Sequence, residues 1–281
     1  MTTKSKQLLI TGVSSGLGRA FALEAVRVGH RVVGTVRTPE AAAAFEAGGD
    51  VRATAILLDV TDEQAVLAAI AQVEQNQGPI DVLIASAGYG HEGLFEESTM
   101  ADLRRQFEVN VFGTVAVIRA VLPGMRQRRS GHILAVTSIG GLTTSPGLSF
   151  YHGSKYAMEG ILESLGKEMA PLGIYVTAIE PGPFRTDWSG RSMVHSSRTI
   201  HDYDEFYEPI REARARYDGQ QPGDPEKAGA AVLIVIDAGD PPKHLLLGAD
   251  AMTALAASRE AFDRDAARWE SVTRSTDFTS R

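Results

Sequence analysis

The sequence of 281 residues contains no cysteine, which excludes disulfide bonds and thiolate chemistry from its function. It also lacks any apolar run approaching the roughly 18–20 residues that span a bilayer, so we expect no membrane partner. Acidic residues outnumber basic ones by 35 to 28, and the net charge of −7 argues against a nucleic-acid partner. The opening residues MTTKSKQLLI leave no room for the apolar part of a signal peptide, so we expect a cytoplasmic protein.

What the sequence does contain is an alternation of short apolar runs with helical patterns. This alternation predicts a parallel sheet with helices on both faces. The seven predicted strands lie at residues 7–10, 31–36, 53–58, 78–86, 131–138, 173–182 and 244–248. We therefore expect a doubly wound, three-layer α/β/α fold around a seven-stranded parallel sheet.

Two stretches interrupt this alternation. Residues 184–220 are polar, aromatic-rich and poorly periodic, and a segment of that length inside a compact domain is usually a lid or a binding loop. Residues 249–281 have the pattern of a terminal helix followed by a frayed polar end. Because the sequence shows no internal repeat or linker, we expect residues 1–281 to form a single domain.

A glycine-rich loop, TGVSSGLGRA at 11–20, lies between the first predicted strand and the first predicted helix. Glycines there let the backbone come close to a phosphate, and the helix N-terminus adds a partial positive charge. The spacing is G-x-x-x-G-x-G rather than the G-x-G-x-x-G of the common dinucleotide fingerprint, and glycine turns also arise for structural reasons alone. We predict cofactor contacts from Gly12, Ser14, Ser15, Gly16, Leu17 and Gly18.

The end of the second strand distinguishes between nicotinamide cofactors. An acidic side chain there would bind the ribose hydroxyls of NAD, whereas an arginine accommodates the 2′-phosphate of NADP. The sequence GTVRTPE has Val36 at the expected acidic position, followed by Arg37. This favours NADP(H) over NAD(H), and the alternative is that Arg37 is an ordinary solvated surface residue.

The stretch YHGSK places a phenol and an ammonium four positions apart, at Tyr151 and Lys155. On a helix these two side chains share one face. Two solvated residues on an amphipathic helix would explain the pair equally well, so its meaning depends on the other motifs.

Together, the TG-x-x-x-G-x-G loop and the Y-x-x-x-K pair make residues 6–250 resemble the short-chain dehydrogenase/reductase family, which has a Rossmann-like fold. The resemblance implies that Ser138, 13 residues before Tyr151, is a catalytic serine, and that Asn110 in VNVFGT is the family's catalytic asparagine. It further implies that Asp59 contacts adenine and that PGPFRTD closes over the nicotinamide, with Thr186 near the carboxamide. The remaining implied cofactor contacts are Val60, Ala87, Gly88, Pro181, Gly182 and Phe184.

One motif departs from the family pattern. Where the family has Asn-Asn-Ala-Gly after the fourth strand, this chain has Ala85, Ser86, Ala87 and Gly88. The missing amide normally ties neighbouring strands together. We therefore expect a sheet hydrogen bond to be altered while the chemistry is retained.

The resemblance implies that Tyr151 acts as the general acid/base in hydride transfer between a carbonyl compound and its alcohol. Lys155 and the positive charge of oxidised nicotinamide would favour the phenolate, and lowering the tyrosine pKa by two or three units needs roughly 3–4 kcal/mol. Ser138 would polarise the carbonyl oxygen. Asn110 would anchor a water linked to Lys155, and Lys155 would also hold the nicotinamide ribose.

We therefore predict an NADP(H)-dependent oxidoreductase for a ketone or aldehyde and the corresponding alcohol, with NAD(H) as the alternative cofactor. Ketones and hydroxysteroid-like or retinoid-like compounds are the substrates suggested by the tail. A 3-oxoacyl reductase is a rival because MRQRRSG at 125–131 could dock a carrier protein, although Leu172 stands where those enzymes have a basic residue. A rival of another class is a catalytically idle NADP-sensing regulator.

Two further expectations concern metals and assembly. The seven histidines show no H-E-x-x-H motif or other close ligand spacing, so we predict no metal site, and surface or packing roles for His91 and His152. The helices around 103–129 and 150–170 correspond to the family's usual subunit contact, so we expect a homodimer or homotetramer.

Overall fold

The structure of the protein, a computed structural model, describes residues 5–188 and 190–278. Residues 1–4 and 279–281 of the predicted domain, the last three also in the predicted tail, and residue 189 of the predicted lid lie outside the described ones. The strands are β1 (Gln7–Thr11), β2 (Arg31–Val36), β3 (Ala53–Leu57), β4 (Val82–Ala85), β5 (Gly90–Glu92), β6 (Gly131–Val136), β7 (Ile174–Pro181), β8 (Met193–His195) and β9 (His244–Leu247). The α-helices are α1 (Gly16–Arg27), α2 (Pro39–Gly49), α3 (Glu63–Gln77), α4 (Met100–Phe107), α5 (Thr114–Arg128), α6 (Ser149–Met169), α7 (Asp204–Tyr217), α8 (Pro225–Ile236), α9 (Ala249–Arg268) and α10 (Glu270–Arg274).

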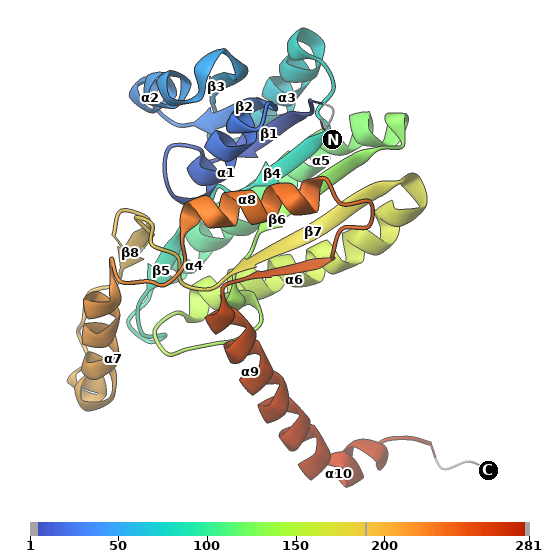
Figure 1. Ribbon diagram of the computed structural model, residues 1–281. Helices are drawn as coiled ribbons and strands as arrows, with labels where there is room; N and C mark the ends of the chain where they lie inside the picture. The colour runs from blue at the N-terminus through green and yellow to red at the C-terminus, as the bar shows by residue number, and fades with distance from the viewer. Residues whose placement is uncertain (1–4, 189, 279–281) are drawn as a thin grey trace.

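The seven predicted strands form one parallel sheet in the order β3-β2-β1-β4-β6-β7-β9 (Figure 1). The predicted doubly wound α/β fold is thus confirmed. The order turns back at β1, which has β2 on one side and β4 on the other. In open α/β sheets, ligands bind beyond the carboxyl ends of the strands at such a point.

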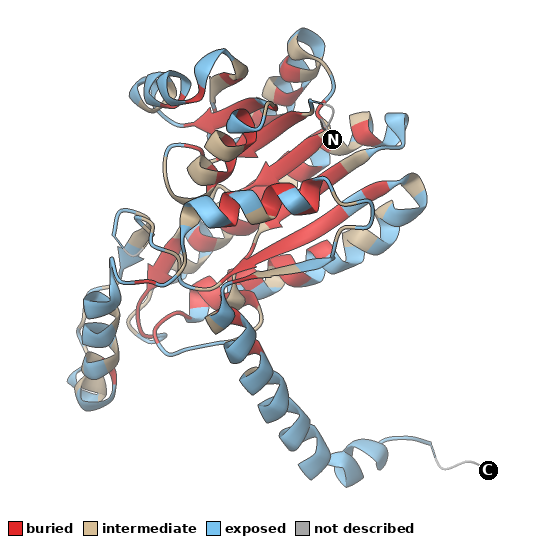
Figure 2. Ribbon diagram, in the orientation of Figure 1, coloured by how far each residue is buried: buried red, intermediate tan, exposed pale blue. Residues whose placement is uncertain are grey.

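Helices cover both faces of the sheet and make the three layers. Helices α1, α2 and α8 pack on one face, where Phe21, Phe45 and Val232 are fully buried. Helices α3, α5 and α6 cover the other face with a second apolar cluster. Figure 2 shows the central strands buried between these layers, and their near-continuous apolar sequences follow from that double coverage.

A single continuous helix runs from Met100 to Arg128 through α4, a π-helical turn at Glu108–Gly113 and α5. It begins with a capping box between Thr99 and Asp102. The helix is long and apolar enough to pass a length-and-composition test for a membrane span. However, its apolar residues Val117 and Val121 are buried against the sheet, as in the core helix of a globular domain.

The predicted lid segment has more regular structure than its sequence pattern indicated. Strand β8 pairs with β5 in a separate two-stranded sheet, and α7 follows. Arg214 of α7 binds Glu92 of β5 at 2.8 Å, and the Tyr207 hydroxyl donates to the same carboxylate at 3.0 Å. Arg198 forms ion pairs with Glu97 and other carboxylates. These contacts hold the segment against the edge of the domain.

The predicted terminal helix is present as α9, which leaves the body of the domain (Figures 1 and 2). Only Ala251 and Leu255 of this helix are buried, and both lie near its start. Beyond them the helix is exposed, including Phe262. Most of its length therefore makes no contribution to the core.

Candidate active site

The predicted site residues come from loops that follow β1, β4, β6 and β7, together with the start of α6. Because these strands are parallel neighbours, their carboxyl ends meet at one edge of the sheet. The structure thus brings together the glycine loop, Gly88, Ser138, the segment after Pro181 and Tyr151. Each of these loops lies at this edge because it follows the carboxyl end of its strand.

The glycine loop has the conformation of a phosphate-binding turn. Gly12 and Gly16 have positive φ values of 74° and 59°, which side chains other than glycine rarely adopt. A Cβ on Gly18 would lie 2.5 Å from the Gly12 carbonyl oxygen, so the start of α1 approaches the end of β1 closely. Residues Ser14, Ser15 and Leu17 complete the loop, and the first turn of α1 contains no acidic residue. The loop therefore fits an anionic group at the helix N-terminus.

The loop after β4, which departs from the family pattern at Ser86, is joined to β1 by the Thr11 side chain. The Thr11 hydroxyl oxygen accepts hydrogen bonds from the backbone N–H groups of both Ser86 and Ala87, each at 3.0 Å. Thr11 is buried at the end of β1 and therefore ties the loop after β4 to its neighbouring strand. A Cβ on Gly12 would lie 3.0 Å from the Ala87 Cα, so this loop also borders the glycine turn.

The candidate phosphate reader, Arg37, is exposed directly after β2, and Val36 before it is buried. The Asp59 carboxylate accepts hydrogen bonds from the Thr61 backbone N–H at 3.0 Å and the Thr61 hydroxyl at 2.8 Å. The backbone hydrogen bond from Thr61 is the main cause that lowers the Asp59 pKa, with a smaller effect of the Arg37 charge. Val60 is buried and would be 2.7 Å from a Cβ on Gly113, so it packs against the π-helical turn.

Tyr151 lies in the first turn of α6 and is only 6% exposed. Burial raises its pKa to about 12, while a hydrogen bond with the Ser138 side chain acts in the opposite direction. The Ser138 oxygen also accepts from the Gly140 backbone N–H at 2.9 Å, which fixes the serine at the start of its turn. Burial thus outweighs the contact with Ser138, and the Tyr151 pKa is raised. The predicted lowering depends in part on the charge of oxidised nicotinamide and stays a prediction.

Lys155 lies one turn further along α6 and is 7% exposed. Its ammonium donates to the Val136 carbonyl oxygen at the end of β6, at 2.9 Å, and lies 5.8 Å from the centre of the Tyr151 ring. Burial lowers the Lys155 pKa to about 8. The solvated amphipathic pair that could have explained YHGSK is therefore excluded, because both side chains are buried at the same edge of the sheet.

Asn110 occupies the π-helical turn, where the backbone departs from α-helical spacing, and is 2% exposed. Its amide nitrogen donates to the Tyr89 carbonyl oxygen at 3.0 Å and to the Ser154 hydroxyl at 3.2 Å. Its amide oxygen accepts from the Tyr89 backbone N–H at 3.1 Å. A Cβ on Gly88 would lie 3.1 Å from the Asn110 oxygen and 3.9 Å from the Lys155 nitrogen. Gly88, which has no side chain, thus lies next to both Asn110 and Lys155.

The segment after Pro181 folds back across the glycine loop. A Cβ on Gly16 would lie 3.9 Å from the Thr186 side chain, and Phe184 forms an isolated bridge with Gly223. Gly182 follows the end of β7 directly and contacts the start of α9. The structure therefore places this segment beside the glycine loop, and its predicted closure over the nicotinamide stays a prediction.

The two histidines near the site have packing roles, as predicted. The His152 Nδ1 lies 2.8 Å from the Gly140 carbonyl oxygen, and its Nε2 accepts from the Ser145 backbone N–H at 3.0 Å. His91 is buried and stacks on Phe150, with ring centres 5.4 Å apart. His152 thus holds the loop that carries Ser138.

Two residues of the site were missed by sequence reasoning. The Ser154 hydroxyl donates to the Tyr151 carbonyl oxygen at 2.7 Å and accepts from Asn110, so it joins α6 to the π-helical turn. The Trp188 ring lies 5.3 Å from the Tyr151 ring. The serine is visible inside YHGSK, whereas no pattern around Trp188 indicated that the lid would bring it to the tyrosine.

Comparison with known proteins agrees with this geometry. Residues 6–195 match the family described as short chain dehydrogenase. An oxidoreductase of Botryotinia fuckeliana is 36% identical over 95% of this chain and 98% of its own length. A 3-ketodihydrosphingosine reductase of Bacteroides thetaiotaomicron is 36% identical, covering 86% of this chain and 87% of its own. The crystal structure of a short-chain dehydrogenase from Streptomyces avermitilis is 40% identical, with a TM-score of 0.90, and covers 98% of this chain and 99% of that one.

Proposed function

The chain belongs to the short-chain dehydrogenase family and is an NAD(P)-dependent oxidoreductase acting on CH–OH groups, and from this premise we propose that it is an NADP(H)-dependent reductase of a ketone or aldehyde. The observation that carries the proposal is the buried phenol of Tyr151, which interacts with the Ser138 side chain and lies one helical turn from Lys155. A buried phenol beside a second hydroxyl can bind a carbonyl oxygen through two donors.

The residues of the glycine loop fit a dinucleotide, because positive φ angles and close backbone approach leave room for a diphosphate. We propose that Gly12, Gly16 and Gly18 form this cradle and that Thr186 closes it. Bound NADPH supplies the hydride, and the positive charge of its oxidised ring favours the phenolate. The exposed Arg37, with no acidic side chain at Val36, supports NADPH over NADH.

In the reduction, Tyr151 would donate its proton to the oxygen as negative charge develops there. Its raised pKa keeps the phenol protonated until that moment. Ser138 would hold the same oxygen. Lys155, whose pKa burial lowers to about 8, would return a proton to the phenolate and hold the ribose. Asn110 would anchor the water that connects Lys155 with solvent.

The test of this proposal is Tyr151→Phe, with Tyr156→Phe as the matched control. Tyr156 lies on the same helix but is 44% exposed. We expect Tyr151→Phe to lower kcat about 100-fold or more, because it removes the proton donor, and to leave NADPH affinity nearly unchanged. The control should keep wild-type kcat. A Tyr151→Phe enzyme that retained more than about a tenth of kcat would contradict the assignment.

For the substrate we propose an apolar ketone. The named ketone substrate of the Bacteroides relative supports this, as does the Trp188 ring beside Tyr151. Phe95, which lies against Phe150 with ring centres 5.7 Å apart, is 73% exposed and could contact an apolar chain. A screen of methyl ketones of increasing chain length with NADPH would test this, and kcat/KM should rise with length. A preference for short, charged ketones would contradict it.

The two alternative functions gain little support. Arg128 pairs with Glu74 at 3.1 Å and Arg129 donates to the Pro171 carbonyl oxygen at 2.6 Å, so both serve the fold, which weakens the case for carrier docking. An idle sensor would not need a buried tyrosine–lysine pair. A cytoplasmic location, a homo-oligomeric state and the absence of nucleic-acid and membrane partners remain proposals that rest on composition and family resemblance.

A further inference from the structure

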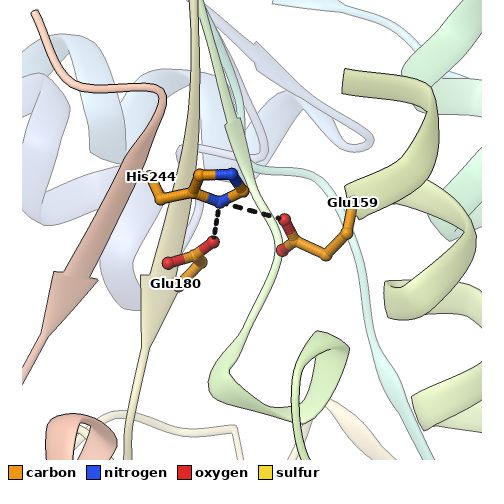
Figure 3. A group of neighbouring side chains, drawn as sticks. All are labelled: Glu159, Glu180 and His244. Atoms are coloured by element: carbon orange, nitrogen blue, oxygen red, sulfur yellow. Dashed lines mark hydrogen bonds and ion pairs between the residues drawn. The ribbon is translucent and has the colours of Figure 1, made fainter. Parts of the chain in front are cut away.

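Behind the proposed active site, three side chains from three different elements meet at one point (Figure 3). Glu159 belongs to α6, one helical turn beyond Lys155, while Glu180 belongs to β7 and His244 begins β9. The His244 Nδ1 lies 2.6 Å from one Glu180 oxygen and 3.7 Å from one Glu159 oxygen. One candidate ligand atom from each of the three residues lies within 4.8 Å of the other two.

The two carboxylates are buried without adequate partners. Glu180 is fully buried, and the Glu159 side chain is 9% exposed. Neither oxygen of Glu159, and only one of Glu180, receives a hydrogen bond of normal geometry within the described part of the chain. The Thr137 hydroxyl and the Glu180 side chain both interact with Glu159. The Thr137 proton goes to the Ile179 carbonyl oxygen at 2.9 Å, and a hydrogen bond between the two carboxyl groups requires a proton on one of them. Burying a carboxylate without hydrogen-bond partners or a counter-charge costs free energy, so the cluster needs positive charge from another source.

His244 cannot supply enough positive charge alone. The imidazole Nδ1 can donate one proton, and that proton lies between His244 and Glu180 at hydrogen-bond distance. A single proton on Glu159, shared with Glu180, would satisfy two of the three remaining carboxylate oxygens and leave the third without a hydrogen bond. One divalent cation would satisfy all three side chains together.

We propose that Glu159, Glu180 and His244 bind a divalent first-row transition-metal cation, Zn²⁺ or Mn²⁺. One imidazole nitrogen with two carboxylates is a ligand set that such ions accept, at bonds of about 2.0–2.2 Å. The His244 side chain is 45% exposed, which provides an entry path and room for water in the remaining positions. Our prediction of no metal site was based on close spacing in the sequence. Such spacing could not reveal this cluster, because its ligands come from positions far apart in the chain.

The cation has a structural role, because it joins the helix of Tyr151 and Lys155 to β7 and to the edge strand β9. Glu159 also packs beneath the turn that carries Ser138, since a Cβ on Gly141 would lie 3.0 Å from the Glu159 side chain. No group of the hydride-transfer site is a ligand. The inference therefore stands independently of the proposed function.

The experiment measures Zn²⁺ and Mn²⁺ binding to tag-free protein that has been treated with chelator. Isothermal titration gives stoichiometry and affinity, thermal denaturation gives the shift in Tm, and Mn²⁺ electron paramagnetic resonance gives the bound signal. The variants are Glu159→Gln and His244→Gln. The matched control is Glu163→Gln, one turn further along α6, where the side chain is 51% exposed and pairs with Lys167.

We expect one site per chain, a rise in Tm with metal, and at least a tenfold loss of affinity in both site variants, with the control unchanged. Because His244 is partly exposed, its variant should fold even if the buried Glu159→Gln does not. The proposal is overturned if the wild-type protein binds neither ion with one-to-one stoichiometry. It is equally overturned if the site variants bind as well as Glu163→Gln, since binding would then involve other histidines.

Discussion

Thr11→Val tests how β1 is joined to the loop after β4, where Ser86 stands in place of the family's asparagine. The Thr11 hydroxyl accepts from two backbone N–H groups, those of Ser86 and Ala87, each at 3.0 Å. Valine keeps the shape of threonine, so the substitution opens no cavity and removes only the acceptor. Leaving a buried donor unsatisfied costs about 1–3 kcal/mol, and both donors are half-buried, so we expect a loss near 2 kcal/mol.

In a domain of this size, 2 kcal/mol corresponds to a fall in Tm of about 4–8 °C. The assay is differential scanning calorimetry at fixed protein concentration, because assembly would also change Tm. Thr54→Val is the matched control, since this half-buried threonine of β3 has no side-chain hydrogen bond within the described part of the chain. NADPH affinity should also fall in Thr11→Val, because Ala87 borders the glycine turn at Gly12.

Amide hydrogen exchange provides the independent measurement. Exchange at Ser86 and Ala87 should accelerate in Thr11→Val and remain slow in Thr54→Val. If the two variants have the same Tm and the same exchange at these amides, then the Thr11 hydroxyl does not tie the strands together. The reasoning about the altered motif would then be refuted.

The remaining predictions concern the cofactor, pH and assembly. Arg37→Ala should raise the KM for NADPH roughly 10- to 150-fold and leave NADH little changed, because a charge-assisted contact contributes about 1.5–3 kcal/mol; an unchanged kcat/KM ratio between the two cofactors would remove the basis for the NADP preference. In metal-free protein the pKa of Glu159 is raised from 4.5 to about 7, so its protonation stabilises the fold at low pH and this contribution is lost as pH rises through 7. Glu159→Gln should flatten that part of the curve of Tm against pH, and a curve that keeps its wild-type slope would contradict the raised pKa. Phe112→Glu should convert a homodimer to monomers in light scattering, because this side chain is 59% exposed on the predicted subunit face, and a monomeric wild type at micromolar concentration would speak against the interface.

Much of the fold was predictable from the sequence, since each strand of the sheet is a short apolar run between helical patterns. The seven predicted strands all lie in the sheet, with ends displaced by a few residues. Strands β5 and β8 were not predicted, because each has only three residues and they pair across about a hundred positions. Helix α7 was missed because its sequence is strongly polar and Tyr207 is its one buried residue.

The sequence alone predicted most of the chemical groups of the candidate site, with Ser154 and Trp188 as the exceptions. Local patterns include the glycine spacing, the Tyr151–Lys155 pair and the serine at position 138. They can be read from the sequence because neighbouring residues set the local backbone geometry. Only the tertiary structure decided the environment of these groups. Burial raises the pKa of Tyr151, Thr11 accepts a hydrogen bond from the loop after β4, and Trp188 reaches the tyrosine ring. Glu159, Glu180 and His244 likewise meet only because parallel strands and a crossover helix bring distant residues to one place, and desolvation depends on that packing rather than on sequence spacing.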